Sequence, residues 1–113
     1  MPNELNPAKK RHPVPAVFES LGIPDVRPSD SFKLSYKNGL IEASVHRADG
    51  TTQTVTKTVD GGFSQMSQFN PNKMEKQDRN ELIKQFYEKG DTQKEISSKF
   101  GLSQAAISKI VNS

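Results

Sequence analysis

The 113-residue sequence has no cysteine and no tryptophan, and only two of its residues are histidine. Without cysteine the chain can form neither disulfide bonds nor thiolate metal sites. His12 and His46 lie far apart in the sequence, without the spacing of metal ligands or a partnered nucleophile. We therefore expect no metal, no cofactor and no catalytic site, and hence a protein that is not an enzyme.

Long hydrophobic runs and phosphate-binding loops are also lacking. No apolar stretch approaches the roughly 20 residues of a membrane span, and no signal peptide is visible at the amino end. Gly61 and Gly62 indicate a turn rather than a nucleotide-binding loop. These absences predict a cytoplasmic protein with no membrane partner.

What the sequence does contain, in its last third, is apolar residues at helical spacing. Three stripes recur: Leu82, Ile83, Phe86 and Tyr87; then Ile96 and Phe100; then Ile107, Ile110 and Val111. They predict helices at about 76–89, 93–100 and 104–111. Isolated helices shorter than roughly 12 to 15 residues are marginal in water, so the two short helices must pack on the first and on each other.

The ends of these helices carry their own signals. Thr92 and Glu95 fit a capping box, and Ser103 is suited to cap the last helix. Gly90 follows the first helix as a left-handed C-terminal residue would. Gly101 interrupts an otherwise helix-compatible stretch, where a glycine costs about 1 kcal/mol relative to alanine, and so predicts a turn between the last two helices.

This stretch resembles the helix-turn-helix of bacterial and phage DNA-binding proteins. The matching positions are Ile96, Ser97, Phe100, Gly101, Leu102, Ile107 and Ile110, with Ser97 where the family more often has alanine. The run SQAAISKIV is similar to the recognition helices of Cro-type repressors, and RNELIKQFYEKGDTQKEI resembles the DNA-binding domains of resolvases and invertases. The resemblance covers residues 76–112 and implies a three-helix module that reads duplex DNA.

An argument from chemistry leads to the same function. With the apolar stripe inward, the outer side of the last helix presents short or hydrogen-bonding side chains that suit base edges in the major groove. The start of the preceding helix suits a phosphate. The predicted DNA-binding residues are Thr92, Gln93, Lys94, Ser103, Gln104, Ala105, Ser108, Lys109 and Asn112. The alternative is a three-helix protein-interaction module with a solvated polar face.

Charge favours more than one DNA-binding module. The whole chain has a net charge of +3, and residues 73–113 hold eight Lys or Arg against six Asp or Glu, a net of +2. So small a positive charge predicts weak binding by a lone module. We therefore expect a homodimer on an inverted-repeat operator.

The period changes to two between Phe32 and Val59, where Asn38-Gly39 and Asp49-Gly50 mark hairpin turns. This pattern predicts a three-stranded antiparallel meander with one weakly apolar face and no helix long enough to cover it. A half-covered sheet favours pairing with a second copy. The predicted dimerisation residues are Phe32, Leu34, Tyr36, Ile41 and Val45.

A weaker resemblance touches the same half. The stretch VPAVFESLGIPDVRPSDSFKLSYKNGLIEASV is similar to the swapped-hairpin domain of transition-state regulators and antitoxins through Val14-Pro15, Leu21-Gly22-Ile23, Asp30 and Asn38-Gly39. It departs from that pattern in having Pro-Ser-Asp for Pro-Gly-Asp and a longer Pro24-to-Arg27 segment. The resemblance implies an intertwined dimer.

These observations predict an α+β protein with an N-terminal β-meander and a C-terminal helix-turn-helix domain. The expected parts are a flexible basic arm at 1–14, a β-rich dimerisation domain at 15–60, a linker at 61–72 and the DNA-binding domain at 73–113. The Lys9-Lys10-Arg11-His12 cluster of the arm either adds phosphate contacts or is simply solvated.

The sequence as a whole thus predicts a transcription regulator, a repressor of a bacterial, phage or plasmid operon, that reads double-stranded DNA with helix 104–111. Because the chain begins with Met and ends soon after the helices, we expect a self-contained regulator. Two alternatives stay open. One is a DNA-binding accessory protein of a recombination or partition system, and the other is an antitoxin-like regulator that binds a protein partner.

Overall fold

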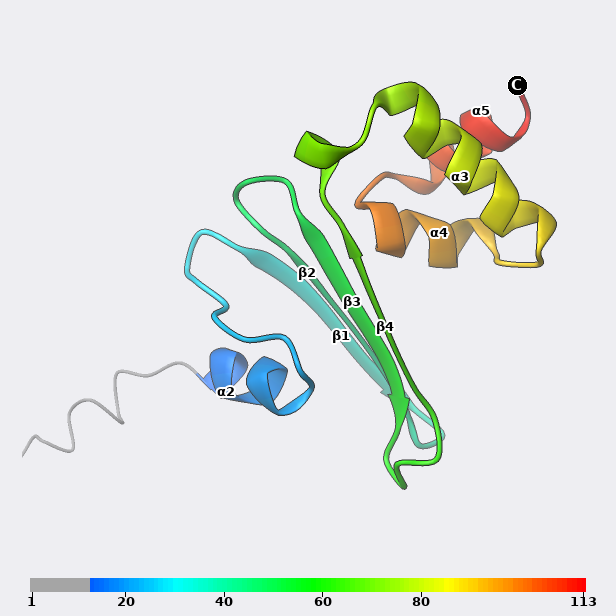
Figure 1. Cartoon of the computed structure of the whole chain (residues 1–113). Coiled ribbons are helices and arrows are strands. Elements are labelled where there is room, and N and C mark those ends of the chain that lie inside the picture. The colour runs from blue at the N-terminus through cyan, green and yellow to red at the C-terminus, as the bar shows by residue number, and fades with distance from the viewer. Residues whose placement is uncertain (1–12) are drawn as a thin grey trace, which may run out of the picture.

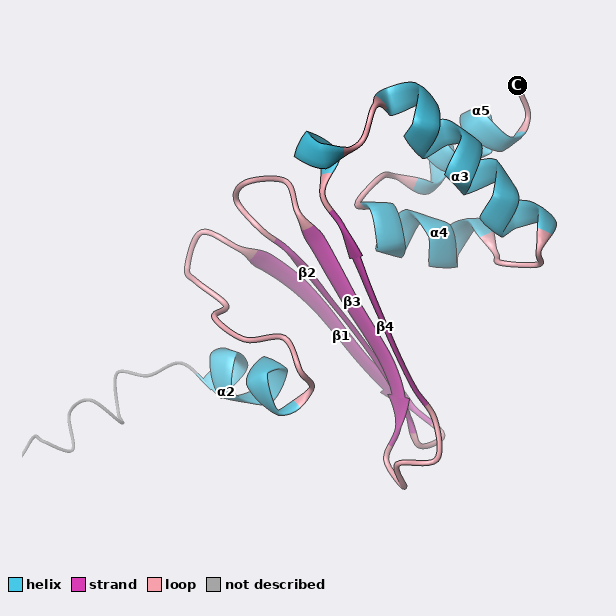
Figure 2. Cartoon of the chain, viewed as in Figure 1, coloured by secondary structure: helices cyan, strands magenta, loops and turns pink. Residues whose placement is uncertain are grey.

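The computed structural model describes residues 13–113 and places them in a four-stranded antiparallel sheet, an N-terminal helix and three C-terminal helices (Figures 1 and 2). The elements are α2 (Pro13–Ser20), β1 (Ser31–Lys37), β2 (Leu40–His46), β3 (Thr52–Thr58), β4 (Ser64–Phe69), the 3-10 turn η1 (Pro71–Lys73), α3 (Lys76–Glu88), α4 (Gln93–Phe100) and α5 (Gln104–Val111). The predicted α+β class is confirmed. Pro13 and Val14, assigned to the arm, instead begin α2.

The sheet is a meander with the strand order β1-β2-β3-β4. Asn38 and Gly39 have φ angles of 53° and 78°, which form the tight turn that pairs Lys37 with Leu40. The fourth strand was not predicted, because Ser64–Phe69 lies in the segment assigned as a linker. That linker prediction is wrong, and the polar composition of β4 explains why.

Strand β4 pairs antiparallel with β3 through the backbone, and polar side chains add hydrogen bonds between the two strands. The Thr54 and Ser67 hydroxyls hydrogen-bond to each other, and Gln53 Nε2 donates to Gln68 Oε1 at 3.2 Å. Ser, Gln and Gly give little of the apolar alternation that identifies a strand in a sequence. The partner strand, rather than local preference, therefore sets the conformation of β4.

One face of the sheet has an apolar core under α2. The buried residues are Phe18, Ile23, Ala43, Val45 and Val55. Phe18 comes from α2 and Ile23 from the loop after it, and both are fully buried. The expectation that no helix is long enough to cover the sheet is therefore wrong for this part of the face, because the eight-residue helix α2 and a single isoleucine cover β2 and β3 here.

The opposite face shares a second core with the helices. It contains Phe69, Ile83, Ile96, Phe100 and Ile107. Phe69 is the last residue of β4, and its ring centroid lies 4.9 Å from that of Phe100 in α4. Side chains alternate between the two faces along a strand, so α2 and this contact between Phe69 and Phe100 lie on opposite sides of the sheet. We call the Phe69–Phe100 contact the joint between the sheet and the helices. Only η1 and a short turn separate β4 from α3, so no free linker joins the two parts.

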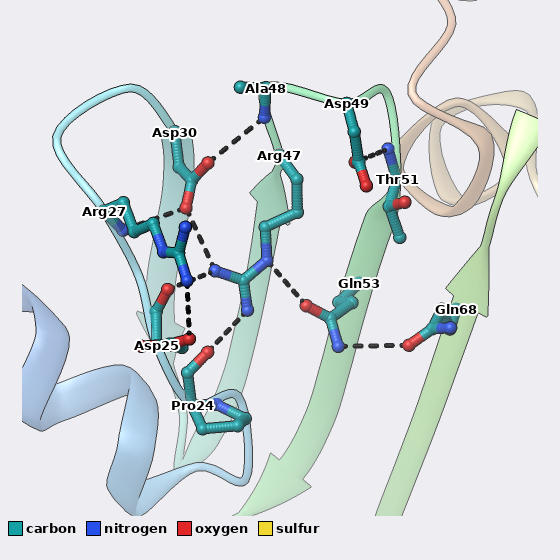
Figure 3. Close-up of polar contacts among 10 residues, drawn as sticks. All are labelled: Pro24, Asp25, Arg27, Asp30, Arg47, Ala48, Asp49, Thr51, Gln53 and Gln68. Carbon is teal, nitrogen blue, oxygen red and sulfur yellow. Dashed lines mark hydrogen bonds and ion pairs between the residues drawn. The ribbon is translucent and has the colours of Figure 1, made fainter.

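Arg47, just after β2, ties the loop between α2 and β1 to the sheet (Figure 3). Its guanidinium donates to the carbonyl oxygens of Pro24 at 2.6 Å and Asp25 at 2.8 Å, and to Asp30 Oδ2 at 3.0 Å. Its Nε atom donates to Gln53 Oε1 at 2.8 Å. The Asp30 side chain is only 4 % exposed, so this ion pair is shielded from water.

The Asp30 carboxylate is fully engaged. It accepts the backbone N–H groups of Arg27 and Ala48 at 2.9 and 3.1 Å besides the Arg47 contact. Burial raises the pKa of Asp30, but these hydrogen bonds and the nearby guanidinium outweigh burial and hold the pKa below its ordinary value. The charged pair thus fixes the path of the loop that carries Ile23 onto the sheet.

The first prediction concerns the contacts of Arg47 with the loop between α2 and β1. Replacing Arg47 by Lys keeps the charge but removes the planar fork, so the carbonyl oxygens of Pro24 and Asp25 lose their donors. We expect the free energy of unfolding, measured by urea denaturation, to fall by about 2–4 kcal/mol. The matched control is Arg27→Lys, since the Arg27–Asp25 pair is exposed and should contribute less than about 1 kcal/mol. Equal losses in the two variants would contradict a structural role specific to Arg47.

Candidate nucleic-acid interface

The first helix of the candidate interface, α4, begins at a complete capping box. Thr92 Oγ1 accepts the backbone N–H of Glu95 at 3.1 Å, and the Glu95 carboxylate accepts the Thr92 N–H at 2.8 Å. The sequence prediction of this cap is confirmed. The cap satisfies two amides that the start of a helix would otherwise leave without partners.

Gly101 ends α4 in the left-handed conformation, with φ 69° and ψ 28°. The N–H groups of Gly101 and Leu102 both donate to the Ser97 carbonyl, at 2.9 and 3.2 Å. The predicted turn is therefore present. Gly101 has a second role that the sequence did not reveal: an added Cβ atom would lie 2.6 Å from Thr52 Oγ1 on β3. The turn between α4 and α5 is therefore in close contact with β3.

The last helix, α5, begins at Ser103, whose hydroxyl accepts the Ala106 N–H at 3.1 Å, as predicted. Ile107 is fully buried against α3 and α4. On the opposite side of α5, Gln104, Ala105 and Lys109 are exposed.

The outer surface of α5 also has one internal hydrogen bond. Asn112 Nδ2 donates to Ser108 Oγ at 3.2 Å, which aligns two of the predicted contact residues along the helix. Lys109 forms no ion pair with any residue in 13–113. Within the described residues, no side chain therefore holds the amide of Gln104 or the ammonium of Lys109 in place.

The remaining predicted contacts lie at the start of α4. Thr92 is exposed and Gln93 is half-buried. Lys94 is exposed too, but it lines a groove between α4 and the polar face of the sheet, together with Glu95, Ser98 and Lys99. The structure thus separates Lys94 from the outer face of α5 and brings it close to the sheet.

Lys99 has a structural role that sequence reasoning missed. Its Nζ atom lies 2.7 Å from Asp91 Oδ2 and 4.9 Å from the centroid of the Phe86 ring. These contacts connect the C-terminal half of α4 to the end of α3. The spacing of eight residues between Asp91 and Lys99 spans a turn and a helix, so no local pattern could have identified the pair.

The predicted dimerisation residues lie on one face of the sheet, but they are not all exposed. Phe32, Leu34 and Tyr36 on β1 are 44 %, 47 % and 66 % exposed, and Ile41 is half-buried. Val45 is fully buried in the core under α2, so its assignment to an exposed interface is wrong. The correction follows from Phe18 and Ile23, which already cover this end of the face.

His46 lies where the turn meets the sheet. Its Nδ1 atom is 3.1 Å from Thr52 Oγ1, and the added Cβ at Gly101 would lie 3.2 Å from the same nitrogen. Burial lowers the pKa of His46, and the positive charge of Lys33 on β1 lowers it further. The folded protein therefore favours the neutral imidazole at this contact.

Residues 1–12, which contain the basic cluster of the predicted arm, lie outside the described part of the chain. Within residues 13–113 no helix has the length and apolar character needed to cross a membrane, and no group of three or more His, Asp or Glu side chains could hold a metal ion. Comparisons with protein-family models, curated proteins and solved structures gave no match to this chain.

The second prediction tests the two roles of Gly101. Gly101→Ala should destabilise the fold by about 2–4 kcal/mol, because a left-handed alanine is strained and its methyl group also overlaps Thr52. Thermal and urea melts of Gly90→Ala provide the control, since Gly90 also has positive φ but an added Cβ there meets nothing within 4 Å. Thr52→Ala in the Gly101→Ala background should recover part of the loss. If Gly90→Ala and Gly101→Ala were equally destabilised, the contact with the sheet would be unimportant.

The third prediction concerns pH. Because the folded state lowers the His46 pKa below its ordinary value of 6.5, the unfolded chain binds more protons on acidification. The free energy of unfolding should therefore fall as the pH drops below about 6.5, and His46→Gln should flatten this dependence. His12→Gln is the control for the only other histidine. A pH profile that His46→Gln leaves unchanged would refute this assignment.

Proposed function

We propose that this protein is a sequence-specific double-stranded DNA-binding transcription regulator, a cytoplasmic repressor of a bacterial, phage or plasmid operon. It inserts α5 into the major groove of an inverted-repeat operator as a homodimer, and it is not an enzyme. The observation that carries the proposal is the outer face of α5. This face is exposed, contains no acidic residue, and is held by a capped helix and a left-handed glycine turn.

The chemistry of this face suits base edges. A glutamine amide such as that of Gln104 can bond adenine in bidentate fashion, and Lys109 can reach the acceptors of guanine. The methyl group of Ala105 can meet the methyl group of thymine. Lysine and glutamine side chains on an exposed helix also occur on ordinary protein surfaces, but such helices usually carry glutamate as well.

The capping hydroxyls support phosphate contacts at the same time. Thr92 and Ser103 each accept a backbone N–H, which leaves the hydroxyl proton of each free to donate. Both residues are exposed at the positive ends of their helices. They would position the module on the DNA backbone without reading sequence.

A homodimer follows from the low positive charge of the module. A net charge of +2 over residues 73–113, eight basic minus six acidic residues, gives little electrostatic affinity. Lys99 is moreover neutralised by Asp91. Two modules on one operator would compensate through two sets of contacts, with half-sites about 34 Å apart or a multiple of that distance.

The fourth prediction tests the proposed base contacts. The preferred duplex is first selected from DNA of random sequence. On this duplex, Gln104→Ala and Lys109→Ala should each weaken binding by about 1–3 kcal/mol and relax the base preference. The measurement is fluorescence anisotropy on the selected duplex and on single-base variants of it. Gln85→Ala is the matched control, since Gln85 is an exposed glutamine on α3 and not on the proposed recognition helix α5.

Two outcomes would overturn the proposal. Unchanged affinity and preference in Gln104→Ala would show that α5 does not read the groove. Metal-dependent cleavage of DNA by the purified chain would show instead that the protein is an enzyme of recombination.

A further inference from the structure

Strand β1 is an open edge of the sheet. All seven of its residues are exposed, and within residues 13–113 only β2 pairs with it. An open edge presents backbone N–H and C=O groups that can pair with another strand. Natural proteins protect such edges with proline, bulges or charged side chains; β1 has neither proline nor a bulge, and its only charged residues are Lys33 and Lys37.

Hydrogen bonds elsewhere in the sheet show which β1 groups point outward. The N–H of Arg47 donates to the Thr51 carbonyl, and that of Val59 donates to the Gly39 carbonyl. Along β2, odd-numbered residues therefore bond to β3, and even-numbered residues bond to β1. The register then leaves Phe32, Leu34 and Tyr36 with outward backbone groups.

The side chains of the same three residues form an exposed apolar row. They lie on the face that α2 covers only in part, because they pair with Val45, Ala43 and Ile41. The unpaired backbone groups and the unburied apolar side chains thus belong to the same residues. One partner could satisfy both.

We propose that this partner is β1 of a second copy, paired antiparallel about a two-fold axis at Leu34, so that two four-stranded sheets become one continuous sheet. The inference rests on the homodimer part of the proposed function and is independent of DNA binding. It differs from face-to-face packing, which would leave the outward amides of β1 unpaired.

Charge selects the register. A two-fold axis at Leu34 pairs all seven residues, with Phe32 opposite Tyr36 and Lys33 opposite Ser35. Moving the axis to residue 33 would place Lys33 opposite Lys33, and moving it to residue 35 would place Lys33 opposite Lys37. Like charges directly opposite each other destabilise a sheet, so the two lysines disfavour both shifted registers.

The centred register also supplies a positive charge where the sheet has a negative one. Ser35 is paired with Glu42 on β2, so the partner's Lys33 would join the row of Ser35 and Glu42 on the polar face. On the other face, the partner's Tyr36 would lie beside Phe32, whose ring already contacts Phe18 of α2 at 5.3 Å. The Tyr36 end of one β1, which is the more exposed end, would thereby lie next to the Phe32 end of the other, which contacts α2.

The second edge of the sheet is less suited to this role. The outward groups of β4 belong to Ser64, Met66 and Gln68, because the Thr58 N–H donates to the Phe63 carbonyl. This row is mainly polar. The helical module also packs beside this edge, because α4 contacts both β3 and β4 (Figure 1).

The fifth prediction compares two lysine substitutions. Leu34→Lys would place two positive charges opposite each other at the axis, whereas Met66→Lys adds the same charge at a similarly exposed position of β4. By sedimentation at micromolar concentration, the wild type and Met66→Lys should be dimers and Leu34→Lys a monomer that is still folded, with a circular dichroism spectrum like that of the wild type. A monomeric wild type, or a dimeric Leu34→Lys, would overturn the proposal.

Single-cysteine variants test the register, because the natural chain has no cysteine. Leu34→Cys should form a disulfide-linked dimer on mild oxidation, while Lys33→Cys, Ser35→Cys and Met66→Cys should form much less. Preferential cross-linking at any of the latter three would refute the centred register. A monomeric wild type that still binds DNA would overturn this inference and the homodimer part of the proposed function, but not DNA binding. A β1-linked dimer that binds no DNA would overturn only the DNA-binding part of the proposed function.

Discussion

The position of Phe69 constrains the rest of the molecule. This residue ends β4 and at the same time lies inside the helical core, against Phe100. Because the end of β4 is part of the helical core, this segment cannot be a flexible linker between the sheet and the helices. The sheet and the helices therefore form one body, and removing the Phe69 ring would leave a cavity in the core that joins them.

The contact of Gly101 with the sheet depends on this joint. With Phe69 holding α4 against β3 and β4, the turn between α4 and α5 comes against Thr52 and His46. A glycine is required twice at this position, once for its left-handed backbone and once for the space that a methyl group would fill. Mutual fit between turn and sheet thus fixes the direction of α5.

Local chemistry predicted the helical part well. Capping residues, a left-handed glycine and apolar stripes act over a few residues, so Thr92, Ser103 and Gly101 could be assigned from the sequence alone. The hairpin at Asn38-Gly39 was equally readable, since both residues adopt positive φ. These features depend on neighbours in the chain.

The features that sequence reasoning missed depend on distant partners. Strand β4 is polar and exists because β3 pairs with it, and Val45 is buried because Phe18 and Ile23 fold back over it. Arg47 reaches carbonyl groups more than twenty residues away in the sequence. On α5 the positions of Gln104 and Lys109 followed from helical periodicity, whereas the place of Lys94 beside the sheet required the tertiary structure.

A rigid joint changes how the proposed dimer would meet DNA. A flexible linker would let two modules adjust to different half-site spacings, whereas a module fixed to its sheet inherits its position from the dimer axis. If β1 forms that axis, the register of Leu34 against its symmetry mate sets the separation of the two α5 helices. The two lysines of β1 that disfavour shifted registers would then also determine which operator spacing the protein accepts.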